Sequence, residues 1–450
     1  MIGLRTPPEP LTRNDRVLLW VLTLAVAATR VLAISRTMWD WDEALFALAL
    51  LDYDVTAHHP HPPGFPLFIG LAKLIPLDPF HAPQAIAVVA SLFVFPAMFF
   101  LGRELRLPAF SAIAAALLLA FFPNVWFYGG TALSDVPSMV LVVTASALLL
   151  RGCRSDRSLL AGALVLGIAA GFRPQNLLIG FAPFMLAFLH RRRTGFLGGV
   201  ILVAIVAGSY GAAASLSGGW EAYRATLAKH ERYIREVDSF LSPIRPNLAQ
   251  VADDFFVRPY RALPINIAIT LLAAAGLLRR RPLIALGIAL AMFGPFLLFA
   301  WLYLDFHSAS RFSIGYMPLY ALLAAQGIPE HGRRLTLAAL TALLVLWTLP
   351  ALHVVRTTAS PPFAAIAEIR KLMPAITPVY VDPRMAPFAD LWLPEYERRV
   401  AASLRPPPEG VLLREGASRA PGAKSFERDR DRLAGIARPR YFEASLIPAR

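Results

Sequence analysis

Long apolar runs separated by short polar turns dominate the chain from Val17 to about His353. The runs are roughly 14 to 20 residues long, close to the length that a helix needs to cross a bilayer. In lipid every backbone N–H and C=O must be paired within its own segment, so we expect each run to be a helix. The runs cover about 17–34, 85–101, 109–122, 137–150, 159–172, 175–189, 195–214, 263–278, 283–302, 312–328 and 335–353. This pattern predicts an all-α polytopic membrane protein with about 11 transmembrane helices.

The two runs at 159–172 and 175–189 are short and meet at the sequence GFRPQN. They form either two full spans or a re-entrant hairpin. Both readings return the chain to the side from which it left, so the orientation of the other spans does not depend on the choice.

Arginines set the orientation of the spans. The chain carries 44 Lys and Arg against 30 Asp and Glu, a formal net charge of +14, and only 16% of its residues are charged. The arginines gather in short turns, each separated from the next by two apolar runs, as in cytoplasmic loops. The clusters are Arg5/Arg13/Arg16, Arg103/Arg106, Arg151/Arg154/Arg157, Arg191/Arg192/Arg193, Arg279/Arg280/Arg281 and Arg333/Arg334. This distribution argues against a nucleic-acid surface and predicts that segments 35–83, 215–262 and 354–450 are extracytoplasmic.

The same features predict the compartment. We expect a multi-pass protein of the bacterial inner membrane, in contact with membrane lipid, because no eukaryotic sorting signal is apparent. The first run has no small-residue cleavage site, so we interpret it as a retained helix rather than a cleaved signal. Cys153 is the only cysteine and lies in a predicted cytoplasmic turn, which excludes a disulfide within the chain.

Two external segments have patterns of their own. The stretch GGWEAYRATLAKHERYIREV predicts an amphipathic helix at the membrane interface, either a lid without chemistry or part of a site. Its apolar positions are Trp220, Tyr223, Leu227, Ile234 and Val237. We divide the chain into a transmembrane domain, 1–353, and a small external α/β domain, 354–450. In the latter PPFAAIAEIRKL is helix-like, TPVYVD is strand-like, and partial disorder is expected.

Ionisable residues gather at the predicted outer face, where burying a charge costs several kcal/mol unless it is used or paired. Asp40, Asp42 and Glu43 lie close together, and neighbouring carboxylates raise one another's pKa, so one of them is a candidate base. The alternative is helix capping, with Asp42 as the cap of ALFALAL and Glu43 in its first turn. The capping interpretation weighs more for Asp40 than for Asp42.

The loop HHPHPPGFPL follows and contains His58, His59 and His61. An H-H-x-H pattern without a fourth ligand is a weak metal signature. The prolines fix the backbone of the loop. The sequence therefore leaves the cofactor open, with a divalent metal ion as one possibility and Asp42, Asp135 and His61 as its candidate ligands.

Three further groups lie at the outer ends of apolar runs. Asp135 in ALSDVPSM is a candidate site residue or a plain helix cap with Pro137 just inside the helix. Arg173 in GFRPQN, and His307 with Arg311 in LDFHSASRF, offer positive charge suited to a phosphate. The alternative for the arginines is contact with lipid head groups.

The order of these motifs resembles the GT-C superfamily of multispanning glycosyltransferases, in particular its protein mannosyltransferase and aminoarabinose transferase group. The likeness covers about residues 15–330. It rests on Asp42-Glu43 after the first helix, His61-Pro62-Pro63 in the same loop, Asp135 as a second acidic position, and Arg311 in HSASRF. The extra histidines of the loop depart from the family pattern, and the external tail shows no recognisable family domain.

The resemblance implies a GT-C-like bundle that moves a sugar from a polyprenyl-phosphate donor to an acceptor at the outer face, with inversion. Asp42 would be the base, and Glu43 would orient the acceptor, which is an unidentified protein, lipid or glycan. Arg311, His307 and Arg173 would hold the donor phosphate. The residues expected to shape the site or bind the acceptor are His61, Asp135 and His59.

Two other classes remain open. A transporter or flippase would use the same carboxylates and arginines to bind substrate or protons, but it predicts charges near helix midpoints and broken helices there. The charges here lie at helix ends, and no internal repeat of fixed period is visible. A structural or assembly protein has no need for the D-E and H-P-P pair. The sequence therefore favours a membrane enzyme.

Overall fold

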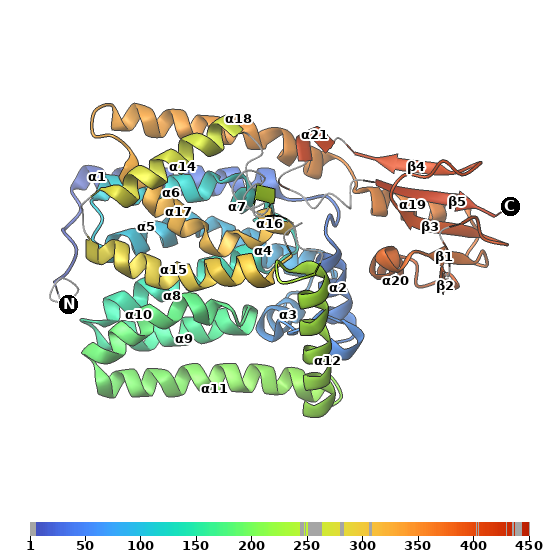
Figure 1. Ribbon diagram of the computed structural model, residues 1–450, viewed down its shortest axis with the longest axis horizontal. Helices are drawn as coiled ribbons and strands as arrows, with labels where there is room; N and C mark the ends of the chain where they lie inside the picture. The colour runs from blue at the N-terminus through green and yellow to red at the C-terminus, as the bar shows by residue number, and fades with distance from the viewer. Residues whose placement is uncertain are drawn as a thin grey trace.

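The computed structural model describes residues 6–243, 247, 249–250, 263–279, 283–305, 308–401, 403, 405–428, 430–433, 436 and 443–449. Most of them form a bundle of helices that run side by side (Figure 1). The helices of the bundle are α1 (Arg13–Arg30), α4 (His81–Leu92), α5 (Val94–Glu104), α6 (Ala109–Phe121), α8 (Asp135–Gly152), α9 (Asp156–Phe172), α10 (Asn176–His190), α11 (Arg192–Leu216), α14 (Leu263–Leu278), α15 (Leu283–Tyr303), α17 (Met317–Gly327) and α18 (Arg333–Thr357).

Each apolar run of the sequence contains a helix, but a count of about 11 crossings is not confirmed. In the described part of the chain five helices are long and apolar enough to cross a membrane, or six if α4 and α5, bent by 45° at their junction, form one span. The five include α1, α8, α11, α15 and α18. Shorter apolar helices include α6, α10 and most of α14. The chain is therefore an integral multi-pass membrane protein.

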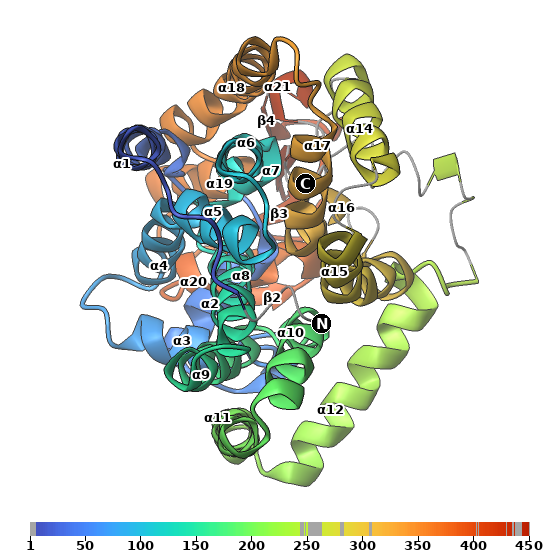
Figure 2. The same ribbon diagram turned by 90° about the vertical axis from the view of Figure 1, so that its left-hand side faces the viewer.

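Helix α8 lies inside the bundle, as a view along the helices shows (Figure 2). Of its 18 residues, 78% are buried, whereas only 17% of the most apolar 18-residue stretch is buried in α1 and in α11. Alanine and glycine allow close packing around α8: Gly162 of α9 lies against Leu149, where an added Cβ would come within 2.8 Å of Leu149 Cγ. The first residue of α8, Asp135, is thereby held at one end of the bundle interior.

The same end of the bundle carries the remaining helical pieces (Figure 1). These are α2 (Trp41–Leu51), α3 (Pro66–Lys73), α7 (Pro123–Tyr128), α12 (Trp220–Tyr233) and the short α16 (Ala309–Phe312). Helix α12 confirms the predicted amphipathic helix and runs across the ends of the bundle helices rather than along them. Its Tyr223 is buried, while Trp220 is exposed.

The tail forms a small α/β unit, as the sequence predicts. Its five-stranded sheet has the order β2-β1-β3-β5-β4, with β1 parallel to β2 and β3, and β5 antiparallel to β3 and β4. The strands are β1 (Val379–Val381), β2 (Arg398–Val400), β3 (Val411–Glu415), β4 (Lys424–Glu427) and β5 (Glu443–Pro448). The helices are α19 (Pro361–Leu372), α20 (Ala386–Trp392) and α21 (Arg430–Leu433). Partial disorder of the tail stays a prediction.

The tail and the membrane part share a hydrophobic core. One hydrophobic cluster joins Ala44 and Ala47 of α2, and Met38 just before it, to the tail. Its tail members include Phe388 of α20 and Ile366 of α19. Helix α18 also runs to Thr357, past the expected boundary at residue 353. The tail is therefore packed directly against the helix that carries Asp42 and Glu43.

Candidate functional site

The guanidinium of Arg311, on α16, is the centre of a buried charge cluster. Its Nε donates to Asp135 Oδ2 at 2.9 Å. Its Nη1 lies 2.5 Å from Asp42 Oδ2 and 3.3 Å from Asp40 Oδ1. Arg311 is only 1% exposed, and these three carboxylates hold its pKa above the usual value against the effect of burial. One side chain thus joins Asp40 and Asp42, which are close in the sequence, to the distant Asp135.

Arg173 extends the cluster by binding the same oxygen of Asp135 as Arg311 does. It follows the last residue of α9, and its Nη2 lies 2.8 Å from Asp135 Oδ2, while its Nε donates to Ser134 Oγ at 2.9 Å. Asp135 is the first residue of α8, and its carboxylate binds the two arginines instead of capping the helix. The capping alternative for Asp135 is therefore wrong.

The start of α2 is fixed by a reciprocal cap. Asp40 is the N-cap, and its Oδ1 accepts from Asp42 N at 3.0 Å. Glu43 accepts from the backbone N–H groups of Trp39 and Asp40 through Oε2, at 2.5 and 2.8 Å. The alternative in which Asp42 caps the helix is wrong, because Asp40 has that place. Asp42 lies in the first turn, and its carboxylate contacts Arg311.

Glu43 has no exposed surface, and its other oxygen, Oε1, accepts from Ala132 N at 2.8 Å. Burial raises the pKa of Glu43 to about 7, and the three backbone donors work against that rise. Both oxygens are thus engaged by the backbone. The contacts tie the start of α2 to the segment before α8, so Glu43 holds together the two elements that bear Asp42 and Asp135.

The histidine loop lies beside Asp42. His61 Nδ1 is 3.5 Å from Asp42 Oδ1, and the ring stacks on Phe46 with centroids 5.8 Å apart. Burial lowers the pKa of His61 to about 3, against the opposing effect of Asp42. The loop is held by Gly64, whose φ of +104° and whose contact with Tyr53 leave no room for a side chain.

The other two predicted histidine positions lie differently. His59 pairs through its backbone with Asp54, at 2.7 and 2.8 Å, which closes the loop. The structure thus gives His59 a contact within the loop, whereas His61 reaches the acidic cluster. His307 lies outside the described residues.

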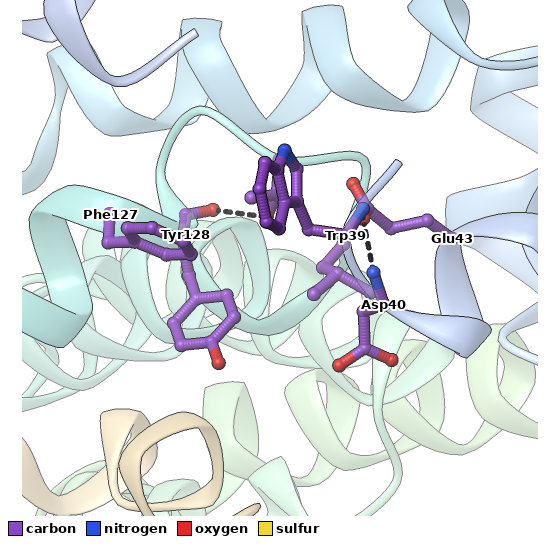
Figure 3. Close-up of a pocket in the computed structure, with 7 residues that line it drawn as sticks. Trp39, Asp40, Glu43, Phe127 and Tyr128 are labelled. Carbon is purple, nitrogen blue, oxygen red and sulfur yellow. Dashed lines mark hydrogen bonds between the residues drawn. The ribbon is translucent and has the colours of Figure 1, made fainter. Parts of the chain in front are cut away.

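A small pocket of about 10 Å³, enough for about one water molecule, lies behind the start of α2 (Figure 3). It is lined by Trp39, Asp40, Glu43, Phe127, Tyr128, Thr131 and Leu133. The carboxyl groups of Asp40 and Glu43 point in different directions, the first toward Arg311 and the second toward the backbone. Asp40 and Glu43 therefore make different contacts, although they are only three residues apart.

Two contacts of the site come from residues that the sequence analysis missed. The carbonyl of Ile436 accepts from Tyr128 Oη and from Ser310 Oγ, both at 2.7 Å, next to Arg311. His230 of α12 faces His61, with ring centroids 6.3 Å apart. A signal for His230 was present, because it follows the buried Tyr223 by seven residues, which places both on one helix face. No local pattern marks Ile436.

The carboxylates do not suit a divalent metal ion. Asp40, Asp42 and Asp135 already converge on Arg311, whose charge occupies the position between them. Within the described parts of the chain no group of three or more His, Cys, Asp or Glu side chains is arranged to hold a metal. No chemical step is therefore assigned to a metal at Asp42, Asp135 and His61.

A helical bundle with a buried charge cluster at one end defines a multi-pass membrane protein with a polar site among helix ends. No protein-family model matches the sequence, and no curated protein matches it. Solved structures of membrane glycosyltransferases do match, and the one with a TM-score of 0.50 shows that the chain shares its fold.

Three of these structures show the extent of the likeness. The apo oligosaccharyltransferase of Archaeoglobus fulgidus has a TM-score of 0.50 at 12% identity, over 86% of this chain and 64% of that one. ArnT from Cupriavidus metallidurans, bound to undecaprenyl phosphate, has a TM-score of 0.48 at 15% identity, over 86% and 85%. The mycobacterial arabinofuranosyltransferase AftD has 0.46 at 16%, over 84% and 31%. The chain thus spans less than two thirds of the oligosaccharyltransferase.

Proposed function

We propose that this chain is a membrane glycosyltransferase that moves a sugar from a polyprenyl-phosphate donor to an acceptor at the extracytoplasmic face. The GT-C fold supports this class of reaction, and the motif resemblance supports the kind of donor. The observation that carries the proposal is the arrangement around Arg311. Its Nε and Nη1 bind three carboxylates, while its buried Nη2 has no hydrogen-bond partner among the described residues.

An unpaired buried N–H group of a charged side chain is costly, so a ligand that accepts from it is favoured there. Nη2 of Arg311 is the group that we assign to the donor phosphate. Arg173 is bound to Asp135 and Ser134, so its role is to hold Asp135 and, through it, Arg311. His307 keeps its expected place at the phosphate as part of the proposal.

Asp42 is the base. Its side chain is 15% exposed, compared with 5% for Asp40 and 4% for Asp135, so it is the most accessible of the three carboxylates. Arg311 holds Oδ2 and leaves Oδ1 on the side of His61. Asp42 is thus bound at Nη1 of Arg311, and the donor phosphate is assigned to Nη2 of the same guanidinium. This arrangement positions acceptor and donor together.

In the proposed reaction the acceptor hydroxyl or amine attacks the anomeric carbon. The new bond to that carbon forms as its bond to the phosphate oxygen breaks, and the bonding electrons leave with the lipid phosphate. Asp42 takes the acceptor proton, and Arg311 stabilises the charge that develops on the phosphate. A single displacement inverts the anomeric centre. Glu43, engaged by three backbone amides, positions α2 rather than contacting the acceptor.

The placement of the charges disfavours a transporter or flippase. Asp40 precedes α2, Asp135 begins α8 and Arg173 follows α9, so all three lie at helix ends. A proton or substrate pathway through the membrane calls for ionisable groups along the middle of the spans.

The test is transfer from a panel of radiolabelled polyprenyl-phosphate sugars in membranes that contain wild type, Asp42→Asn or Asp52→Asn. Asp52 is exposed at the end of the same helix and is the matched control. We expect transfer by wild type and Asp52→Asn, and its loss in Asp42→Asn with binding of undecaprenyl phosphate retained. Transfer by Asp42→Asn would exclude Asp42 as the base. No transfer by wild type from any donor would contradict the proposed function.

A further inference from the structure

Helix α12 forms one wall of the region around Asp42. Tyr223 Oη donates to the carbonyl of Pro63 at 2.7 Å, and the N–H of Val55 donates to Ser217 Oγ at 2.9 Å, just before the helix. These two bonds join α12 to both ends of the histidine loop. They hold His230, about two helical turns beyond Tyr223, over that loop.

Three imidazoles follow one another from Asp42 to the surface. His61 Nδ1 is 3.5 Å from Asp42 Oδ1, the rings of His61 and His230 have centroids 6.3 Å apart, and those of His230 and His58 are 6.4 Å apart. The side chains of Asp42 and His61 are 15% and 18% exposed, His230 is partly buried, and His58 is exposed. The series leads from the proposed base to solvent.

The proposed reaction leaves a proton on Asp42 that must depart before the next turnover. A polyprenyl phosphodiester carries one negative charge, and the phosphate monoester that leaves carries nearly two at neutral pH, since its second pKa is about 6. Each transfer thus releases close to one proton to solvent. Arg311 covers Oδ2 of Asp42, so the proton's way out is Oδ1, on the side of His61.

We propose that His61, His230 and His58 form the path by which this proton leaves Asp42, and that His230 is the link on which the path depends. The inference rests on the proposed function. In each step an imidazole accepts a proton at one ring nitrogen and releases another from the second nitrogen. The acceptor proton therefore reaches solvent, and every ring ends with the number of protons with which it began.

The spacing and the charges suit such a path. Centroids 6.3 to 6.4 Å apart put neighbouring rings beyond direct hydrogen-bond contact but within the span of one bridging water. Burial lowers the pKa of His61 and His230, so both rings are neutral and each keeps one donor and one acceptor nitrogen.

Most charged groups around the rings disfavour a positive charge on an imidazole, and Asp42 is the exception. Arg311 and Arg173 disfavour a positive charge on His61, and Lys229 disfavours one on His58, while Asp42 favours a charge on His61 and His230. A proton that reaches the rings is therefore passed outward and does not stay as a stable imidazolium.

The experiment compares transfer by full-length wild type, His230→Ala, His230→Gln and His81→Gln, with and without added imidazole. His81, the first residue of α4, is exposed and pairs with Asp78 just before that helix. It serves as the control. We expect His230→Ala and His230→Gln to lower kcat about tenfold or more, with KM unchanged, because neither side chain relays protons. Added imidazole should restore His230→Ala, whose cavity admits it, but not His230→Gln.

Each outcome decides the proposal. Wild-type transfer with an unchanged kcat in His230→Ala, from about pH 6 to 8, would overturn the proton path and leave the glycosyltransferase proposal intact. A lowered kcat that imidazole does not restore would assign His230 a purely structural role and also overturn the path. No wild-type transfer from any donor would overturn both proposals together.

Discussion

Replacing Arg311 by methionine tests whether this one side chain balances the charge cluster. Methionine is close in length and apolar, so the change removes the charge with little loss of volume. Asp40 and Asp42 then lose their described cation, while Asp135 keeps Arg173 at 2.8 Å. The cluster goes from three carboxylates with two guanidiniums to three carboxylates with one.

The magnitude follows from burial. Arg311 is 1% exposed, and none of its three partner side chains exceeds 15%. Removing one partner of a buried ion pair costs about 3–5 kcal/mol, because the other charge remains buried without compensation. We expect Arg311→Met to lie at the upper end of this range, since two carboxylates are left. That is a large part of a typical folding free energy of about 5–15 kcal/mol.

The control is the triple variant Arg311→Met/Asp40→Asn/Asp42→Asn. It retains the pair of Arg173 with Asp135 and leaves no uncompensated charge in the cluster, so most of the lost stability should return. Asp40→Asn keeps a good helix cap, because asparagine caps about as well as aspartate. The measurement is the unfolding midpoint of the detergent-solubilised protein, followed by tryptophan fluorescence in denaturant.

Two results would refute the reasoning. If Arg311→Met unfolded at the same denaturant concentration as wild type, the carboxylates would not depend on Arg311. If the triple variant were less stable than Arg311→Met alone, the loss would come from packing and not from charge. Arg311→Lys separates the fork from the charge: we expect an intermediate midpoint, because an ammonium cannot bridge three carboxylates in the same geometry.

Two further predictions concern Glu43 and the Ile436 carbonyl. An unfolded Glu loses its proton near pH 4.5, whereas buried Glu43 keeps it to about pH 7. Between these pH values the folded protein binds more protons than the unfolded chain. Its free energy of unfolding therefore falls as pH rises, by on the order of 3 kcal/mol. Glu43→Gln should remove this slope in the Tm measured from about pH 4.5 to 7, and an unchanged slope would contradict it. Ser310→Ala combined with Tyr128→Phe should weaken undecaprenyl-phosphate binding and lower the Tm by the equivalent of about 1–3 kcal/mol, because the buried Ile436 carbonyl loses both its donors. Tyr320→Phe, away from this carbonyl, is the control, and equal binding by all variants would exclude the effect.

The sequence predicts the helices and part of the site because both leave local patterns. Apolar runs and arginine turns locate the spans, and Asp42, Asp135, Arg173 and Arg311 all stand at helix ends of one face, where the structure joins them. A local pattern cannot assign partners. Asp40 caps α2 and also contacts Arg311, which lies 271 residues from Asp40 in the sequence, so no local pattern shows that contact.

Other features depend on packing alone. The acids of Asp42 and Glu43 are adjacent in sequence, yet one faces a guanidinium and the other faces three amides, including that of Ala132 on another segment. The count of about 11 crossings stays unconfirmed, and one apolar run divides into α4 and α5, which bend by 45° between them. Periodicity reports neither the bend nor the partner.

The contact of Ile436 with Ser310 and Tyr128 has a consequence for biosynthesis. Tyr128 and Ser310 are synthesised before residue 436. The carbonyl that accepts their hydrogen bonds is therefore made only when the ribosome has passed residue 436. Until then α16 lacks this anchor, and the Arg311 guanidinium lacks its final support. A nascent chain can thus contain every residue of the charge cluster while the carbonyl that binds Tyr128 and Ser310 has still to be made.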